Sequence, residues 1–142
     1  MAEPYVATGC FYSPNAGKVL LHLRSSDAPF NPDMWSLFGG YCEETDGGNP
    51  VTTWLREVRE ELGIKLERSL VMSLTGLEPI PGPSGPRHPF YYEWHDVRDD
   101  FRLTEGQALA WFGVDEALAL HNLSDETKVF LGHMREHLLP AD

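Results

Sequence analysis

The chain has 142 residues and carries 22 acidic side chains against 11 basic ones, which gives a formal net charge of -11 at pH 7. A chain of this length can bury a core without disulfides, and its content of 42% hydrophobic and 11% aromatic residues argues against a disordered protein. The acidic excess argues against a general nucleic-acid binder, because binding to a phosphate backbone depends on clustered lysine and arginine. An anionic substrate remains compatible with this charge if metal ions screen the repulsion.

The cysteine content and the absence of long apolar runs predict where the protein resides. Two cysteines, Cys10 and Cys42, make no disulfide framework and fit a reducing compartment. The first residues lack the basic and apolar regions of a signal peptide, and no run approaches the roughly 18 apolar residues of a membrane span. We therefore expect a cytoplasmic protein without a membrane or a stable nucleic-acid partner, and a homodimer is left open.

The first predicted elements form a hairpin. Two β-prone runs, 6–12 and 18–24, flank a segment rich in turn-forming residues. A loop with two prolines then leads into a short strand, 35–38, which runs directly into Gly39 and Gly40. We expect the two glycines to lie at the end of this strand, where a glycine-rich loop begins.

A capped helix follows that loop. Asn49 is a typical N-cap, Pro50 suits the first helical position, and Gly63 is a stop signal, so the sequence predicts a helix over 50–62. Its apolar residues recur at spacings of four, three and four, which places them on one stripe that faces a core: Val51, Leu55, Val58 and Leu62.

The second half of the sequence continues the alternation of strands and helices. The predicted segments are an apolar run at 70–77, a loop rich in proline and glycine at 79–89, strands at 90–97 and 107–112, a short helix at 114–120 and a last helix from Ser124 to about residue 138. No internal repeat or long linker divides the sequence. We expect one domain over residues 1–142, of the α/β or α+β class.

Three glutamates of the capped helix are spaced so that their carboxylates converge. At 100° per residue, Glu57, Glu60 and Glu61 fall within an arc of about 100° beside the apolar stripe. Like charges at these spacings repel one another and oppose the helix dipole, so stability alone does not favour them. A solvated acidic face, with Arg56 and Lys65 as ion-pair partners, is the structural explanation. A site for hard divalent cations, which prefer oxygen ligands, is the functional one.

The context of these glutamates resembles the signature of the Nudix hydrolase family, and of its MutT-like members. The match runs from the Gly-Gly strand end to Ile64, in the sequence GGYCEETDGGNPVTTWLREVREELGI. Its second half, REVREELGI, agrees with the family pattern at every specified position. The resemblance implies an α/β/α sandwich with a mixed central β-sheet.

The first half of the signature departs from the family pattern. Between Gly40 and Arg56 the chain has two residues more than the pattern, and the expected glutamate is missing. Glu43, Glu44 or Asp46 is a candidate for its place. In the family this glutamate is chiefly structural, so the departure concerns the geometry of the loop more than activity.

The resemblance assigns expected roles to the signature residues. It implies divalent metal ions, Mg²⁺ or Mn²⁺, bound by the backbone carbonyl of Gly39 and the carboxylates of Glu57, Glu60 and Glu61. Gly40, Arg56 and Gly63 would be structural, with Arg56 tying the helix to the loop through a salt bridge.

Candidate site residues also lie outside the signature. Glu105, in the tripeptide Glu-Gly-Gln, resembles a glutamate that acts as general base or additional metal ligand in family members that act on nucleoside triphosphates. Glu93 is the second candidate for that role. Arg24 and Arg87 are candidates for contacts with substrate phosphates, and ordinary surface positions are the alternative for both arginines.

The resemblance implies a metal-dependent pyrophosphohydrolase with a small nucleotide as substrate. The Glu-Gly-Gln loop favours nucleoside triphosphates, cleaved to monophosphate and pyrophosphate. Dinucleoside polyphosphates, ADP-ribose and nucleotide sugars are the alternative substrates. A non-catalytic Nudix-like nucleotide-binding domain is the alternative of another class, although such domains usually lose signature glutamates that are all present here.

Overall fold

The computed structural model describes residues 4–74, 76–77, 85–95, 97, 101–103 and 106–139. The elements in chain order are β1 (Val6–Ser13), β2 (Lys18–Leu23), β3 (Trp35–Ser36), β4 (Phe38–Tyr41), the 3-10 turn η1 (Glu44–Asp46), α1 (Pro50–Leu62), the 3-10 turn η2 (Arg68–Leu70), β5 (Met72–Ser73), β6 (Arg87–Glu93), β7 (Ala108–Gly113), α2 (Val114–Leu118) and α3 (Asp125–His137). No helix within these ranges has both the length and the apolar character that crossing a bilayer requires.

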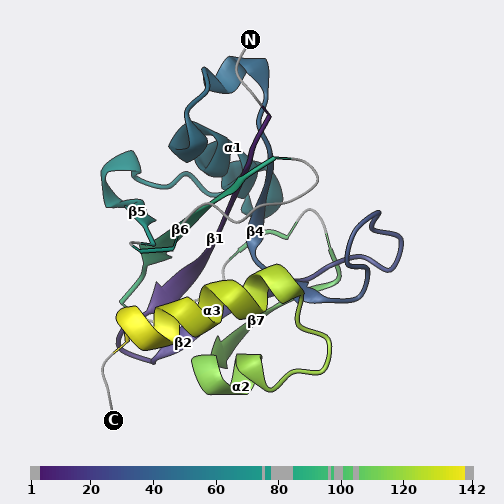
Figure 1. Cartoon of the computed structure of the whole chain (residues 1–142), viewed down its shortest axis with the longest axis vertical. Helices are drawn as coiled ribbons and strands as arrows, with labels where there is room; N and C mark the ends of the chain where they lie inside the picture. Colours follow the sequence, from purple (N-terminus) through teal and green to yellow (C-terminus); the bar gives the residue numbers. More distant parts are fainter. Residues whose placement is uncertain are drawn as a thin grey trace.

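Strand β1 is the centre of a mixed sheet (Figure 1). On one edge it runs parallel to β6, from Val6 opposite Arg87 to Tyr12 opposite Glu93. On the other edge its first half pairs with β4 and its second half with β2, both antiparallel. Strand β2 then extends the sheet to β3 and β7. Because β4 and β2 share one edge of β1, the sheet divides there, and β4 carries Gly39 and Gly40 at the division.

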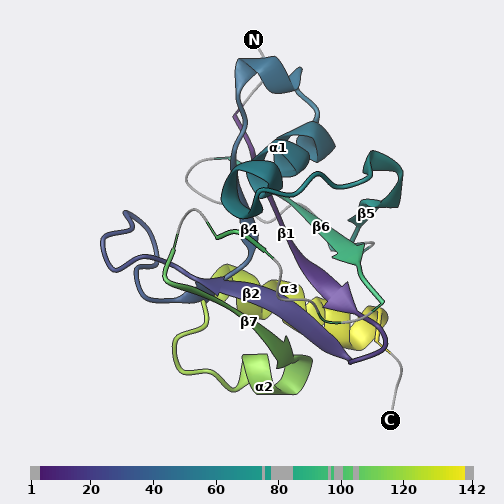
Figure 2. The same cartoon turned by 180° about the vertical axis from the view of Figure 1, so that it is seen from behind.

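Helices cover both faces of this sheet, so every residue of β1 is buried. Helix α3 lies in front of the strands in Figure 1, and α1 lies in front of them in Figure 2. The side chains of β1 therefore alternate between two apolar cores. Ala7 and Phe11 join the core under α1, whereas Cys10 and Tyr12 join the core under α3. This arrangement confirms the α/β/α sandwich.

The predicted helix over 50–62 is confirmed residue for residue. The side chain of Asn49 accepts hydrogen bonds from the backbone N–H groups of Val51 and Thr52, and Gly63 ends the helix with a φ of 67°. Both termini are thus closed by local sequence signals.

Strands that depend on distant partners were predicted less well. The predicted strand 35–38 divides into β3 and β4, because its first residues pair with β2 and its last residue pairs with β1. The apolar run 70–77 forms only the two-residue edge strand β5. Strand β6 starts at Arg87, three residues before the predicted start. Most of the predicted loop 79–89 lies outside the described residues.

Helix α1 packs unusually close to β1, and Gly9 makes this possible. A Cβ atom at Gly9 would lie 2.3 Å from the carbonyl oxygen of Phe90 and 2.8 Å from the ring of Trp54. The indole N–H of Trp54, which is fully buried, donates a hydrogen bond of 3.1 Å to the carbonyl oxygen of Phe38. These contacts hold α1 and its glutamates against β4.

We expect Gly9→Ala to destabilise the fold by about 2 kcal/mol or more, since overpacking at a rigid contact forces backbone shifts. Gly132→Ala in α3 is the matched control, because nothing lies within 4 Å of a Cβ atom at that position and alanine favours a helix. Urea denaturation of both variants measures the difference. Equal stability of the two variants would contradict the proposed role of Gly9.

Candidate active site

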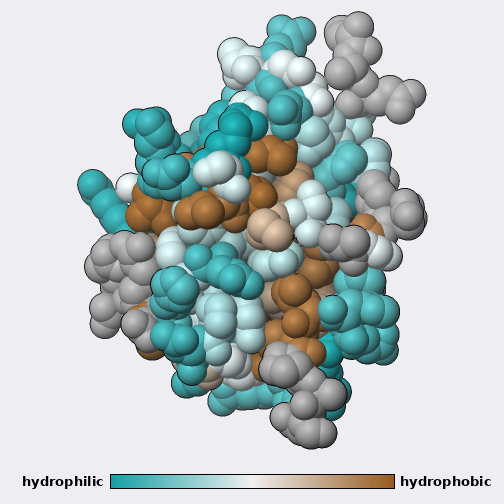
Figure 3. All heavy atoms as spheres, turned by 90° about the vertical axis from the view of Figure 1, so that its left-hand side faces the viewer, coloured by the Kyte–Doolittle hydropathy of each residue, from teal (hydrophilic) through white to brown (hydrophobic). Residues whose placement is uncertain are grey.

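The first candidate cleft is apolar. It has a volume of about 350 Å³ and is lined by residues of α1, β5, β6 and the segment after β5: Pro50, Val51, Ser73, Leu74, Leu77, His88, Pro89 and Phe90. Figure 3 shows apolar side chains gathered on the face of the molecule that carries β5. The pKa of His88, its one titratable lining residue, is lowered by burial. The cleft therefore offers no cation to a phosphate.

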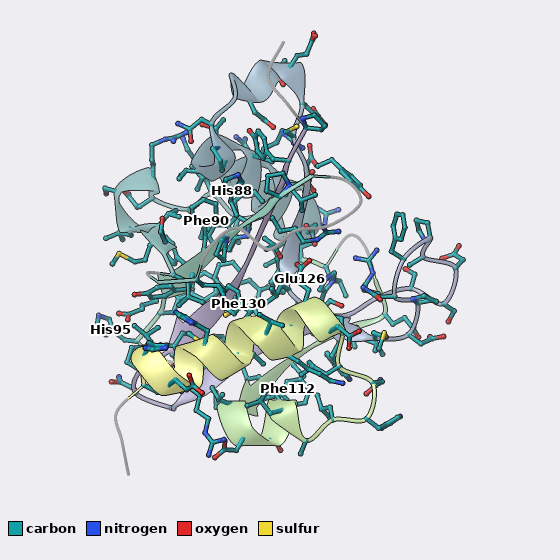
Figure 4. The ribbon with its side chains drawn as sticks, viewed as in Figure 1. His88, Phe90, His95, Phe112, Glu126 and Phe130 are labelled. Carbon is teal, nitrogen blue, oxygen red and sulfur yellow. The ribbon has the colours of Figure 1, made fainter. Side chains whose placement is uncertain are left out.

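A second cleft, which we call the Glu57 cleft, is rich in charged groups. It measures about 400 Å³ and brings together Arg24, Glu43, Glu57, Arg87 and Glu126. Figure 4 shows Glu126 projecting from the N-terminal end of α3 toward the strands, where it forms an ion pair with Arg87 of β6. The cleft thus spans from α1 at one end to α3 at the other, with cations at two places along it.

Glu57 lies against the backbone of β4. A Cβ atom at Gly40 would lie 2.5 Å from the carboxyl carbon of Glu57 and 2.6 Å from its Oε1. Only glycine leaves room for this approach. The carboxylate of Glu57 is thereby held beside Gly39 and Gly40 at the mouth of the Glu57 cleft.

The other two signature glutamates differ in exposure. Glu61 is only 4% exposed, and its Oε1 accepts a hydrogen bond of 3.1 Å from the backbone N–H of Gly39. Glu60 lies one turn from Glu57, and its side chain is 55% exposed. Glu57 and Glu61 therefore meet β4 directly, whereas Glu60 points along the surface.

The guanidinium of Arg56 binds the acidic groups around it. It donates to both carboxylate oxygens of Asp46, at 2.9 and 3.0 Å, and to Oε1 of Glu57 at 2.9 Å. It also contacts Glu60 at 3.3 Å and donates to the carbonyl oxygen of Tyr41 at 2.9 Å. These bonds, to Asp46 above all, raise the pKa of Arg56 above its ordinary value. One side chain thus links β4, η1 and α1.

Asp46 is the most buried of the three acidic residues that are candidates for the missing signature glutamate. It is 4% exposed and accepts hydrogen bonds of 2.8 Å from the backbone N–H of Glu43 and the hydroxyl of Thr53. The hydrogen bonds from Arg56, opposed by burial, lower its pKa from 3.8 to about 2. Of the three candidates from the sequence, the structure gives Asp46 the buried contact with Arg56.

The oxygen atoms around Glu57 suit a hard divalent cation. No three His, Cys, Asp or Glu side chains form a ready metal group in the part of the chain that the structure describes, and Arg56 bridges Glu57 to Glu60. Carboxylate and backbone carbonyl oxygens are nevertheless the kind of ligands that Mg²⁺ prefers. The room that Gly40 leaves for the Glu57 carboxylate is the structural feature that fits such an ion.

The remaining predicted site residues lie in different places. Arg24 follows β2, donates from Nε to the carbonyl oxygen of Phe30 at 2.8 Å and lines the Glu57 cleft. Glu105 lies outside the described residues. Glu93 of β6 lies opposite Tyr12 of β1, whereas Gly39 of β4 lies opposite Thr8. Glu93 is therefore displaced from the level of Gly39 by roughly 13 Å along the strands.

Sequence reasoning missed two residues of the site region. Glu126 lies in the first turn of α3, where an acid complements the helix dipole, and only the fold brings it to Arg87. His22 lies in β2 among buried residues, and its place in the sequence gives no signal of a site. It lines a further cleft of about 500 Å³, on the α1 face of the sheet, together with Arg24.

Comparisons with known proteins agree with this geometry. Residues 3–133 match the model of the family described as NUDIX domain. No curated protein sequence matches the chain.

Solved structures with the same fold cover nearly the whole chain. The MutT protein from Methanosarcina mazei Go1 superposes with a TM-score of 0.72 at 21% identity, over 98% of this chain and 99% of that one. The E. coli dihydroneopterin triphosphate pyrophosphohydrolase gives 0.72 at 20% identity, over 96% of each chain. The NUDIX domain of Shewanella oneidensis NrtR, complexed with ADP ribose, gives 0.68 at 19% identity, over 98% of this chain and 90% of that one.

We expect Asp46→Asn to lower the free energy of unfolding by roughly 2 kcal/mol at pH 7, because the ion pair with Arg56 is lost. Since folding lowers the pKa of Asp46 from 3.8 to about 2, this stabilisation is present above pH 4 and disappears as the pH falls to 2. The difference from the unmodified chain should shrink over that window in urea titrations. Glu44→Gln, at an exposed acid of the same turn, is the control, and an equal effect of both variants would contradict the assignment.

Proposed function

The chain belongs to the NUDIX domain family of pyrophosphate hydrolases, and we propose that it cleaves a nucleoside diphosphate derivative with the help of Mg²⁺ or Mn²⁺. The observation that carries the proposal is the packing of the Glu57 carboxylate against Gly40. Beside it, the backbone N–H of Gly39 donates a hydrogen bond to the carboxylate of Glu61. These contacts supply oxygen ligands at the mouth of a cleft that also contains Arg24 and Arg87.

The residues of the site divide the work between binding and orientation. Glu57, Glu60 and Glu61 hold the metal ions, with the carbonyl of Gly39 as a further ligand. When bound, such ions neutralise the charge of the phosphoryl oxygens and lower the pKa of water. Asp46 keeps Arg56 in place. Glu105 is proposed as the general base that accepts a proton from water.

Two further residues position the substrate. Arg24 lines both the Glu57 cleft and the cleft of about 500 Å³ beside His22. This position supports a contact between its guanidinium and the diphosphate. Arg87 lies at the other end of the Glu57 cleft, paired with Glu126. We assign Arg24 to the phosphates on this basis, and Arg87 to the part of the nucleotide that extends toward α3.

The first candidate substrate is a nucleoside triphosphate, cleaved to monophosphate and pyrophosphate. Its support is the Glu-Gly-Gln loop, in which Gln107 donates to the carbonyl oxygen of Arg24 at 2.8 Å. A fold neighbour is described as a dihydroneopterin triphosphate pyrophosphohydrolase, and another is complexed with ADP ribose. ADP-ribose, nucleotide sugars and dinucleoside polyphosphates are therefore the alternatives to test beside the triphosphates.

We expect Glu60→Gln to reduce metal-dependent hydrolysis by roughly a hundredfold or more, because it removes a charged metal ligand. Its exposed side chain makes it a cleaner test than Glu61, whose buried carboxylate also supports β4. The assay screens a panel of nucleotides with Mg²⁺ or Mn²⁺ and identifies the products by chromatography.

Glu67→Gln removes an exposed acid beyond the end of α1 and serves as the control, which should retain full activity. Wild-type rates for Glu60→Gln would contradict the ligand assignment. If the unmodified chain cleaves no member of the panel, a non-catalytic nucleotide-binding domain becomes the better explanation.

Bound metal should raise the melting temperature, since ligand binding to the folded state stabilises it by about 1.4 kcal/mol at ten times the dissociation constant. For a chain of this size that corresponds to a few degrees. Thermal unfolding with and without millimolar Mg²⁺ or Mn²⁺ measures the shift, and Glu57→Gln should reduce it. A melting temperature that does not respond to either metal would contradict the proposed site.

A further inference from the structure

His22 has a nitrogen without a partner in the interior of the protein. The residue is 5% exposed, and its Nε2 lies 2.9 Å from the carbonyl oxygen of Leu37. A carbonyl oxygen only accepts, so Nε2 carries the hydrogen and Nδ1 carries the lone pair. Among the described residues, Nδ1 is the one buried side-chain nitrogen or oxygen without a hydrogen-bond partner. An unpaired buried acceptor lowers the stability of the folded state. A bound molecule that donates a hydrogen bond to Nδ1 would remove this cost.

The imidazole is held in one orientation and one charge state. Its ring stacks on Phe38, with ring centroids 4.9 Å apart. Burial, with a contribution from Arg24, lowers the pKa of His22 to about 4, against the opposing effect of the bond to Leu37. At neutral pH the ring is therefore uncharged, and Nδ1 is an acceptor.

The surroundings of Nδ1 open into a polar cleft, which we call the His22 cleft. Its lining residues come from the end of β2, the loop that follows and the start of the β7 segment: His22, Arg24, Ser25, Asp27, Ala28, Pro29 and Gly106. A Cβ atom at Gly106 would lie 3.5 Å from Nδ1 and 2.8 Å from the carbonyl oxygen of Leu23. Glycine at position 106 thus lets this segment lie close to the end of β2, beside the unpaired nitrogen.

The chemistry of this lining favours a sugar over a base or a phosphate. One face of His22 is covered by Phe38, and among the described residues that line the cleft there is no other aromatic ring, so a base has little to stack on. A deprotonated phosphate cannot donate to Nδ1 and is repelled by Asp27. Sugar hydroxyls both donate and accept, and the cleft offers acceptors on His22 and Asp27 beside donors on Arg24 and Ser25.

The His22 cleft also adjoins the proposed phosphate site. Arg24 and Pro29 line both this cleft and the Glu57 cleft. The guanidinium of Arg24 uses Nε for the carbonyl oxygen of Phe30, which fixes its position at the border. A molecule whose diphosphate lies at Arg24 can therefore extend one end into each cleft.

We propose that the His22 cleft binds a sugar of the substrate, with a sugar hydroxyl donating a hydrogen bond to Nδ1 of His22. The inference rests on the proposed function for the position of the diphosphate. It assigns His22 a role in specificity, and the sugar is either a second one joined to the diphosphate or the ribose of the nucleoside itself.

Two substitutions at His22 separate binding from structural support. His22→Gln keeps an amide nitrogen near the position of Nε2, for the bond to Leu37, but removes the acceptor at Nδ1. His22→Asn places an amide oxygen near the position of Nδ1 and gives up the bond to Leu37. The exposed His121 provides the control variant His121→Gln. Melting temperatures of all variants establish that they fold.

The experiment measures dissociation constants by calorimetry in Mg²⁺, with non-hydrolysable α,β-methylene analogues of ADP-ribose, ADP and 2′,3′-dideoxy-ADP. If the site holds a second sugar, His22→Gln should weaken ADP-ribose binding about tenfold and leave ADP binding unchanged. If it holds the ribose of the nucleoside, binding of ADP and ADP-ribose should both weaken, and binding of the dideoxy analogue should not. His22→Asn and His121→Gln should bind as the unmodified chain does in either case.

Three results would overturn the sugar site: no change in His22→Gln, an equal loss for all three analogues, or no binding of the ADP-ribose analogue to the unmodified chain. The outcome is independent of turnover. A chain that cleaves diphosphates without any dependence on His22 keeps the proposed function and loses the sugar site. A chain that binds sugars through His22 and cleaves nothing keeps the sugar site and loses the proposed function.

Discussion

The ion pair between the buried Asp46 and the half-buried Arg56 is the interaction on which the geometry of the site depends. Its two parallel hydrogen bonds have the fork geometry that makes arginine–carboxylate pairs strong and directional. Through the same guanidinium the pair fixes the carbonyl of Tyr41, and through Asp46 it fixes the backbone of Glu43. The loop between β4 and α1 is thereby tied to α1, whose Glu57 and Glu61 lie against β4.

The guanidinium of Arg56 also reduces the repulsion within the acidic cluster of α1. Arg56 contacts Glu57 and Glu60 while it binds Asp46, so it offsets part of the repulsion among carboxylates that the helix spacing creates. Asp46 is the most buried of the acidic partners of Arg56 and binds it through two hydrogen bonds. If Glu57 and Glu60 bind a metal ion as proposed, Arg56 would keep its hydrogen bonds to Asp46, and these bonds would still hold the loop.

Features set by neighbouring residues could be predicted from the sequence, and features set by distant contacts could not. The cap at Asn49 and the stop at Gly63 are local, so the bounds of α1 followed directly. The division of one predicted strand into β3 and β4 depends on which strand each half meets. Asp46 reaches Arg56 because of the turn η1, and Nδ1 of His22 is left as the unpaired nitrogen because Nε2 binds the carbonyl of Leu37. Neither contact can be recognised from the spacing of residues in the sequence.

The parallel pairing of β1 with β6 has a consequence for how the chain folds. Val6 lies opposite Arg87 and Tyr12 lies opposite Glu93. The central strand therefore pairs with a strand on the order of eighty residues downstream. Contacts of such long sequence separation slow folding, because a large loop must close before they form. During synthesis the first strand would leave the ribosome well before β6 exists. Until then one edge of the most buried strand stays open to chaperones and to other chains.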